Sequence, residues 1–204
     1  MDAIDNERLI FPRGTIFPRV FYEADTVTVA QELLGAFLVH ETRLGKIVGK
    51  IVETEAYLVD DPACHAHAGK KSARNASMFG PPGTSYIYLI YGMYYCFNVV
   101  TRERGIGEAV LIRALEPLAG LHIMQRNRNT SELRELCSGP GKLAQALGLG
   151  KEQNGISLRK KPLYILSAED AKPTMVTSTR IGLSKASDLP LRFFIKDSPF
   201  VSRK

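Results

Sequence analysis

Apolar and polar residues alternate along much of the chain with the two-residue period of β-strands, and glycine and proline separate the runs. The pattern predicts strands at residues 36–40, 46–57, 84–90, 94–101, 108–115, 163–166, 175–183 and 191–195. Turns at residues 44–45 and 91–92 would join neighbouring strands, and Pro117 is predicted to end the strand before it. Most of these strands therefore pair as antiparallel neighbours.

Helical patterns fall in two places along the chain. They predict helices at residues 26–34, 119–127, 131–136 and 142–147, the last opened by residues 138–141 and ended by Gly148. Residues 1–25 are predicted to be irregular because Pro12 and Pro18 interrupt them, and residues 1–15 form an irregular N-terminal segment. Without repeats or linkers, the chain is expected to form one α+β domain over residues 1–204. Its curved, mostly antiparallel sheet would be flanked by helices.

A long polar segment, residues 59–82, interrupts this pattern. It is rich in small residues and also holds His65, His67, Lys70, Lys71 and Arg74. A segment of this length without regular structure in a compact domain is usually functional or mobile.

Charge is distributed unevenly along the 204 residues. The net charge is +6, with −5 on residues 1–68 and +11 on residues 69–204. This asymmetry favours a polyanionic partner such as nucleic acid, although a basic surface without a partner fits the counts too. No apolar run approaches the roughly 18 residues of a membrane span, and the acidic first seven residues lack a signal-peptide core. We therefore expect a cytoplasmic location. The three cysteines, Cys64, Cys96 and Cys137, are odd in number and are expected to be free thiols.

Glu55 and Arg113 are the first candidates for chemistry. In a strand, Glu53, Glu55 and Tyr57 share one face, so Glu55 could act as a general base with Glu53 as its competitor. Arg113 lies in an apolar run, where a buried guanidinium needs an anionic partner, and Glu55 could be that partner. A solvent-facing glutamate, a structural ion pair or an arginine at a sheet edge are the alternatives.

Six of the eight tyrosines lie between residues 57 and 95. Several must pack in the core, but some could clamp a flat ring by stacking. Asn98 could contact a substrate edge or satisfy backbone groups. His65, His67 and Cys64 match no zinc spacing, so no metal is expected. Lys142 follows a Gly-Pro-Gly helix start that could hold a phosphate or simply begin the helix.

Together these residues resemble the alkyladenine (3-methyladenine) DNA glycosylase family of the mammalian type, which also has bacterial members. The resemblance covers nearly the whole chain after about residue 15. It runs through Val-Glu-Thr-Glu-Ala-Tyr at 52–57 and through residues 74–75, 78–79, 82–84, 86–94, 113–117, 138–143, 180–183 and 190–193. It implies a base-excision repair enzyme that flips a damaged purine out of duplex DNA and hydrolyses its N-glycosidic bond.

The resemblance also implies a role for each site residue. Glu55 would activate the attacking water and Arg113 would help to position it. Tyr57 and Tyr88 would stack on the flipped base, with His65 at its edge. The remaining roles would fall to pocket residues Ala63, Asn98 (against the amino group of guanine) and Leu183, to Tyr91 inserted into the DNA, and to the phosphate-binding residues Lys70, Lys71, Arg74 and Lys142.

The implied enzyme needs no cofactor and no metal. No lysine is placed as a Schiff-base nucleophile, so it would be monofunctional, without strand cleavage. Its expected partner is damaged double-stranded DNA. The enzyme is expected to act as a monomer in the cytoplasm, associated with the nucleoid through DNA. Neither a membrane nor an obligate protein partner is expected. Two other functions remain open at this point: a non-catalytic nucleic-acid-binding module, and a glycosidase or nucleosidase for small molecules.

Overall fold

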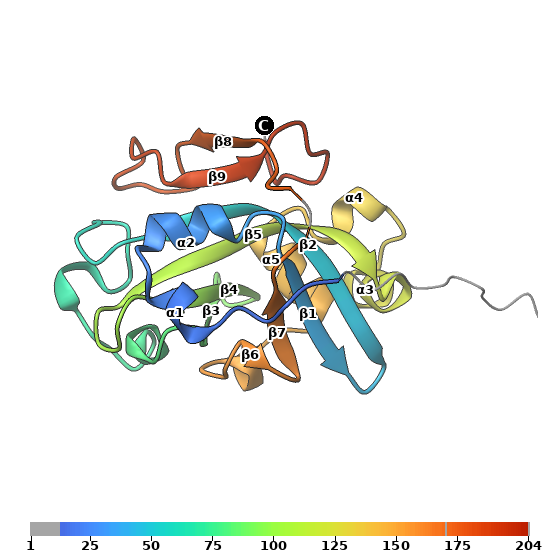
Figure 1. Ribbon diagram of the computed structural model, residues 1–204, viewed down its shortest axis with the longest axis horizontal. Helices are drawn as coiled ribbons and strands as arrows, with labels where there is room; N and C mark the ends of the chain where they lie inside the picture. Colours follow the sequence, from blue (N-terminus) through green and yellow to red (C-terminus); the bar gives the residue numbers. More distant parts are fainter. Residues whose placement is uncertain (1–12, 170, 204) are drawn as a thin grey trace, which may run out of the picture.

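The computed structural model describes residues 13–169 and 171–203. Its strands are β1 (Phe37–Thr42), β2 (Gly45–Tyr57), β3 (Ser85–Ile90), β4 (Tyr94–Thr101), β5 (Glu108–Ala119), β6 (Arg159–Lys160), β7 (Leu163–Leu166), β8 (Met175–Ser178) and β9 (Arg192–Ile195). In the described ranges they form one nine-stranded sheet in the order β3-β4-β5-β2-β1-β7-β6, and β9 joins β2 to β8. All the pairings are antiparallel. Figure 1 shows the curvature of the sheet and confirms the predicted α+β fold.

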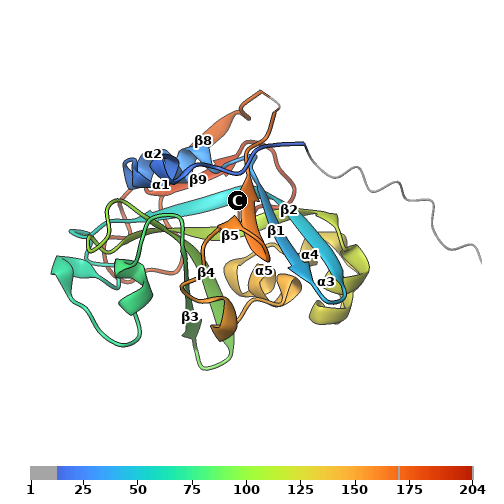
Figure 2. The same ribbon diagram turned by 60° about the horizontal axis from the view of Figure 1, so that its bottom comes forward.

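Helices cover both sides of the sheet. They are α1 (Arg19–Glu23), α2 (Thr26–Glu32), α3 (Leu121–Arg128), α4 (Leu133–Leu136) and α5 (Pro140–Leu147), with 3-10 turns η1 (His67–Gly69), η2 (Ala76–Phe79) and η3 (Lys151–Gln153). Figure 2 shows α1 and α2 on one side and α3, α4 and α5 on the other. Asp25 caps α2 by accepting hydrogen bonds from two backbone N–H groups, and Gly148 ends α5 with a left-handed φ of 67°.

The long central strand β2 changes partners along its length. Its first half pairs with β1, and residues 53–55 in its second half pair with β9, while β5 lies along its other edge. The β2–β5 register shifts around Ile51, Glu53 and Thr54, so that Glu53 lies opposite Ala114 and Thr54 opposite Ile112. Arg113 thus falls at an irregularity of the ladder, where a bulge can redirect a side chain.

Several sequence predictions need correction. Residues 19–23 form α1, although the segment before residue 26 is predicted to be irregular; residues 1–12 of that segment lie outside the described part. Pro117 does not end β5, because it lies opposite Gly49 beside a register shift, where the missing N–H of proline is tolerated. The strand predicted for residues 175–183 stops at Ser178, because Arg180 and Ile181 turn toward partners in the candidate site.

The polar segment 59–82 is folded rather than structureless. It contains η1 and η2, and the Asn75 side chain ties it together by donating hydrogen bonds to the carbonyls of His65 and Lys70. Met78 and Phe79 anchor it in a small apolar cluster with Tyr86. The segment is therefore held against β3, where it can form one side of a pocket.

Candidate active site

Glu55 and Arg113 meet where β2 and β5 pair. Arg113 donates from Nη1 to Glu55 Oε2 at 3.3 Å, and both side chains are buried. The Tyr57 hydroxyl donates to the same oxygen at 2.9 Å, and the Ile181 backbone N–H donates to Glu55 Oε1 at 2.8 Å. Burial and the neighbouring Glu55 raise the pKa of the Tyr57 hydroxyl, so it remains a protonated donor. Protein groups thus fix both carboxylate oxygens in place.

Glu53, the alternative base, is also fully buried. Its Oε1 accepts from Arg113 Nε at 3.0 Å and Arg192 Nε at 2.7 Å, and Ser202 binds both of its oxygens. Protein donors bind both oxygens of each carboxylate, but among these donors only Tyr57, which bonds to Glu55, lines the cavity described next. This arrangement favours Glu55 as the base.

Tyr57, the donor to Glu55, lines a cavity of about 130 Å³, whereas Glu55 itself is fully buried and does not line this cavity. Its lining includes all six residues named from the sequence as a base pocket: Tyr57, Ala63, His65, Tyr88, Asn98 and Leu183. Three further residues line it, Met78, Tyr86 and Ile90. Strand alternation places Tyr86 and Ile90 on the same face of β3 as Tyr88, whereas Met78 comes from η2, for which the sequence carries no strand signal.

Both tyrosine walls carry an arginine. The Arg180 guanidinium lies 4.7 Å from the Tyr57 ring centre and forms a buried ion pair with Asp61. The Arg74 guanidinium lies 5.4 Å from the Tyr88 ring centre, and its Nη2 donates to the Leu89 carbonyl at 3.1 Å. Such cation–π contacts help to fix the ring planes. Arg74 is therefore a pocket neighbour as well as a candidate for phosphate binding.

His65 lies at the pocket edge, with its ring centre 4.6 Å from that of Tyr88. Its Nδ1 is 2.8 Å from the Tyr86 hydroxyl, which can donate to a neutral imidazole and leave the other ring nitrogen free as a donor. Burial and, after it, the charge of Arg74 lower the pKa of His65 below its ordinary 6.5. The ring is therefore neutral at neutral pH.

We expect Arg74→Ala to raise the pKa of His65, because the substitution removes a positive charge that disfavours the imidazolium. A pH titration of the His65 ring signals by NMR would show a midpoint below 6.5 in the wild type and a higher one in the variant. Arg104→Ala, at an exposed arginine, is the matched control and should leave the midpoint in place. An unchanged or lower midpoint in Arg74→Ala would contradict this electrostatic account.

Asn98 satisfies backbone groups, one of the two roles left open by the sequence, and it also lies at the cavity. It is buried and lines the cavity, and its Nδ2 donates to the Tyr86 carbonyl at 3.0 Å and, more weakly, to the Cys96 carbonyl at 3.4 Å. These bonds fix the orientation of the amide within the pocket.

The tip of the β3–β4 hairpin is exposed and apolar. Tyr91, at the turn, is 82% exposed and has a left-handed φ of 53°; Leu89, Met93 and Tyr94 are exposed beside it. Figure 2 shows this hairpin extending away from the body of the molecule. Lys70 and Lys71, in the segment that packs on β3, are also exposed. Lys142 forms an ion pair with Glu135.

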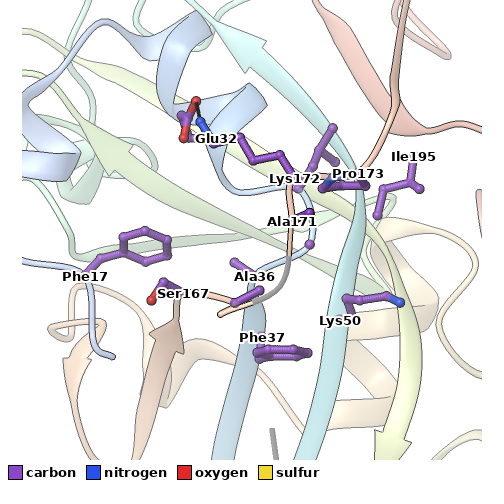
Figure 3. A pocket seen from close by; sticks show the side chains of 13 residues that line it. Phe17, Glu32, Ala36, Phe37, Lys50, Ser167, Ala171, Lys172, Pro173 and Ile195 are labelled. Carbon is purple, nitrogen blue, oxygen red and sulfur yellow. Dashed lines mark hydrogen bonds and ion pairs between the residues drawn. The ribbon is translucent and has the colours of Figure 1, made fainter. Parts of the chain in front are cut away.

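A second cavity, of about 380 Å³, is a weaker candidate for chemistry. Figure 3 shows its lining, which includes Phe17, Phe37 and Pro173. Its two lysines are neutralised, since Lys50 pairs with Glu116 and Lys172 with Glu32.

Residues 13–169 and 171–203 contain no group of three histidine, cysteine or acidic side chains arranged to hold a metal. Their cysteines are free and buried, and none of their helices is long and apolar enough to cross a membrane.

Comparison with known proteins identifies the family of the chain. The family model described as "Methylpurine-DNA glycosylase (MPG)" matches residues 20–199. Relatives with the name "Putative 3-methyladenine DNA glycosylase" include one from Methanoculleus marisnigri, 52% identical over 191 residues (92% of this chain and 98% of the relative). One from Carboxydothermus hydrogenoformans is 50% identical over 191 residues (93% and 100%), and one from Francisella tularensis is 52% identical over 183 residues (88% and 94%). Since the family model matches most of the chain and these relatives align over nearly their whole length, the chain belongs to the methylpurine-DNA glycosylase family.

Proposed function

We propose that this DNA glycosylase removes alkylated and deaminated purines from duplex DNA and hydrolyses the N-glycosidic bond of a nucleotide flipped into the pocket between Tyr57 and Tyr88. Its substrates would be 3-methyladenine, 7-methylguanine, hypoxanthine and ethenoadenine. One observation carries the proposal: Tyr57, a wall of the aromatic pocket, donates a hydrogen bond to the buried Glu55. A ring that lies against Tyr57 would have its sugar close to this carboxylate.

Glu55 then acts as the general base. It takes a proton from a water that attacks the sugar carbon C1′, and the electrons of the breaking C–N bond leave with the purine. Arg113, which shares Glu55 Oε2 with Tyr57, orients the carboxylate and the water. The sugar passes through an oxocarbenium-like state, which the same negative charge stabilises.

The pocket would select damaged purines through several side chains. A purine alkylated at a ring nitrogen is cationic and stacks favourably on tyrosine faces. A neutral His65 adds no repulsive charge to that cation. Asn98, fixed by backbone carbonyls, would crowd the amino group of normal guanine. Leu183 also lines the cavity, and its size would limit which damaged bases fit.

DNA would be held by the hairpin tip and the basic residues around it. Extrusion of a base costs a few kcal/mol, less at a damaged pair, and Tyr91 in the vacated space would offset part of that cost. Lys70, Lys71 and Arg74 would contact phosphates directly. Lys142 would exchange its surface ion pair with Glu135 for a phosphate.

The enzyme would be monofunctional, and none of the described residues that line the cavity is a lysine that could form a Schiff base. We propose that it acts as a monomer on damaged duplex DNA at the nucleoid, without an obligate protein partner.

Duplexes that each carry one of the four lesions, with undamaged duplexes as controls, test the substrate class. Hot alkali after incubation converts each abasic site into a strand break. Breaks in the lesion strand, and none in the undamaged controls, are expected. No alkali-labile site with any lesion would contradict the proposed function, and breaks in undamaged DNA would contradict the proposed selectivity.

A further inference from the structure

A second buried carboxylate lies directly behind the proposed catalytic pair. Glu53 is separated from Glu55 by one residue on β2, and both bind the same arginine: Arg113 donates from Nε to Glu53 and from Nη1 to Glu55. Glu53 does not line the aromatic cavity. Glu55 does not line it either, but it accepts a hydrogen bond from the lining residue Tyr57, and Glu53 is joined to Glu55 through the guanidinium of Arg113.

The guanidinium of Arg113 is held at a third point. Its Nη2 lies 3.3 Å from the hydroxyl of Ser202, and that hydroxyl donates to Glu53 Oε1 at 2.9 Å. A guanidinium is planar and rigid, so bonds at Nε and Nη2 fix the direction in which Nη1 points. Glu53 and Ser202 together thus determine where Arg113 meets Glu55.

Ser202 comes from the C-terminal segment that follows β9, and this segment is anchored on the same cluster. The Ser202 backbone N–H donates to Glu53 Oε2 at 2.6 Å. Arg192 donates to Glu53 and to the Arg203 carbonyl, and so joins β9, the segment and the carboxylate. The cluster contains two arginines and two glutamates, a balance that lowers the cost of burying them.

We propose that Glu53 and Ser202 are positioning residues for the glycosylase reaction, and that the C-terminal segment clamps Arg113 in the orientation that Glu55 needs. This inference rests on the proposed role of Glu55. It assigns to the C-terminal segment a part in the rate of the chemical step, although none of the described residues of this segment lines the cavity.

The test measures single-turnover excision of hypoxanthine together with binding to a duplex that carries an uncleavable abasic analogue. Ser202→Ala should slow excision by about tenfold, as expected when one hydrogen bond to the reacting assembly is lost, and leave the Kd unchanged. Ser202→Thr keeps a hydroxyl and should recover most of the rate. Ser198→Ala, in the same segment but outside the cluster, is the matched control and should match the wild type.

Arg113→Lys distinguishes a positioning role of Ser202 from a merely structural one, because only a positioning role makes the effect of Ser202→Ala on the excision rate depend on Arg113. It keeps the positive charge but lacks the planar fork, so Ser202→Ala should cause no further loss in this background. Glu53→Gln should slow excision more than Ser202→Ala, up to about 100-fold. If Glu53→Gln does not fold, the excision rate of Ser202→Ala alone decides the outcome. A wild-type rate in Ser202→Ala, or an equal further loss in the Arg113→Lys background, would overturn the proposal.

A parallel Glu55→Gln assay separates the two proposals. Loss of excision in Glu55→Gln, with a wild-type rate in Ser202→Ala, would refute the clamp alone. Full excision by Glu55→Gln would refute the proposed role of Glu55 whatever Ser202→Ala does.

Discussion

Glu55→Gln is expected to slow single-turnover excision of hypoxanthine by about 10²- to 10⁴-fold, the usual contribution of a general base. Glutamine is nearly isosteric, and its single carbonyl oxygen can take the place of Oε2 and accept from Tyr57 and Arg113. Its NH2 group cannot accept from the Ile181 N–H, so one bond is lost while the pocket should keep most of its shape. Its amide cannot take a proton from water. Affinity for a duplex with an uncleavable abasic analogue should therefore stay close to that of the wild type, while the chemical step is lost.

Glu116→Gln is the matched control for this variant. Glu116 lies on β5, paired with Lys50 at the surface, and should be replaceable without loss of excision. An equal rate in Glu55→Gln and the wild type would move the base to another residue. A parallel loss of DNA affinity would place Glu55 in binding rather than in catalysis.

Asp61→Asn is expected to lower the free energy of unfolding by about 3–5 kcal/mol, because it leaves the guanidinium of Arg180 buried without its counter-charge. For a chain of this size each kcal/mol shifts Tm by about 2–4 °C. Arg180 also lies against the ring of Tyr57, so the variant should loosen that pocket wall and weaken excision. Thermal unfolding followed by circular dichroism measures the loss.

Glu41→Gln is the control, since Glu41 pairs with Lys161 and Lys46 at the surface, where ion pairs contribute about 0–1 kcal/mol. The double variant Asp61→Leu with Arg180→Met should recover part of the stability lost in Asp61→Asn, because it removes both charges together. A Tm of Asp61→Asn within 1 °C of the wild-type Tm would show that the Asp61–Arg180 pair does not make the expected contribution to the free energy of unfolding.

The sheet could be predicted from sequence because its strands alternate strongly and are joined by turns. β4 and β7 match the predicted bounds, and β1, β2, β3 and β9 lie within one or two residues of them. The errors have local causes. Pro117 is accommodated at a register shift that only the partner strand reveals, and residues 179–183 leave β8 because Asp61 and Glu55, far away in the sequence, bind Arg180 and Ile181.

In the candidate site, too, the parts that depend on local sequence pattern could be predicted, and the parts that depend on long-range contacts could not. Strand alternation places Glu53, Glu55 and Tyr57 together, and the apolar run around Arg113 indicates that it needs an anion; the structure brings these residues together. The pairing of Asp61 with Arg180 and the return of Ser202 to Glu53 depend on long-range chain paths, for which the local pattern carries no signal. Met78 reaches the pocket from a 3-10 turn for the same reason.

The most direct test of the proposed function counts both products of one reaction: free base and abasic strand. Wild-type protein is incubated with a labelled duplex containing a single hypoxanthine, and the released base is quantified by chromatography while the strand is analysed with and without hot alkali. We expect one free hypoxanthine for each alkali-labile site and an intact strand without alkali. Tight binding of the duplex without release of the base would contradict a glycosylase centred on Glu55 and would indicate a binding module instead.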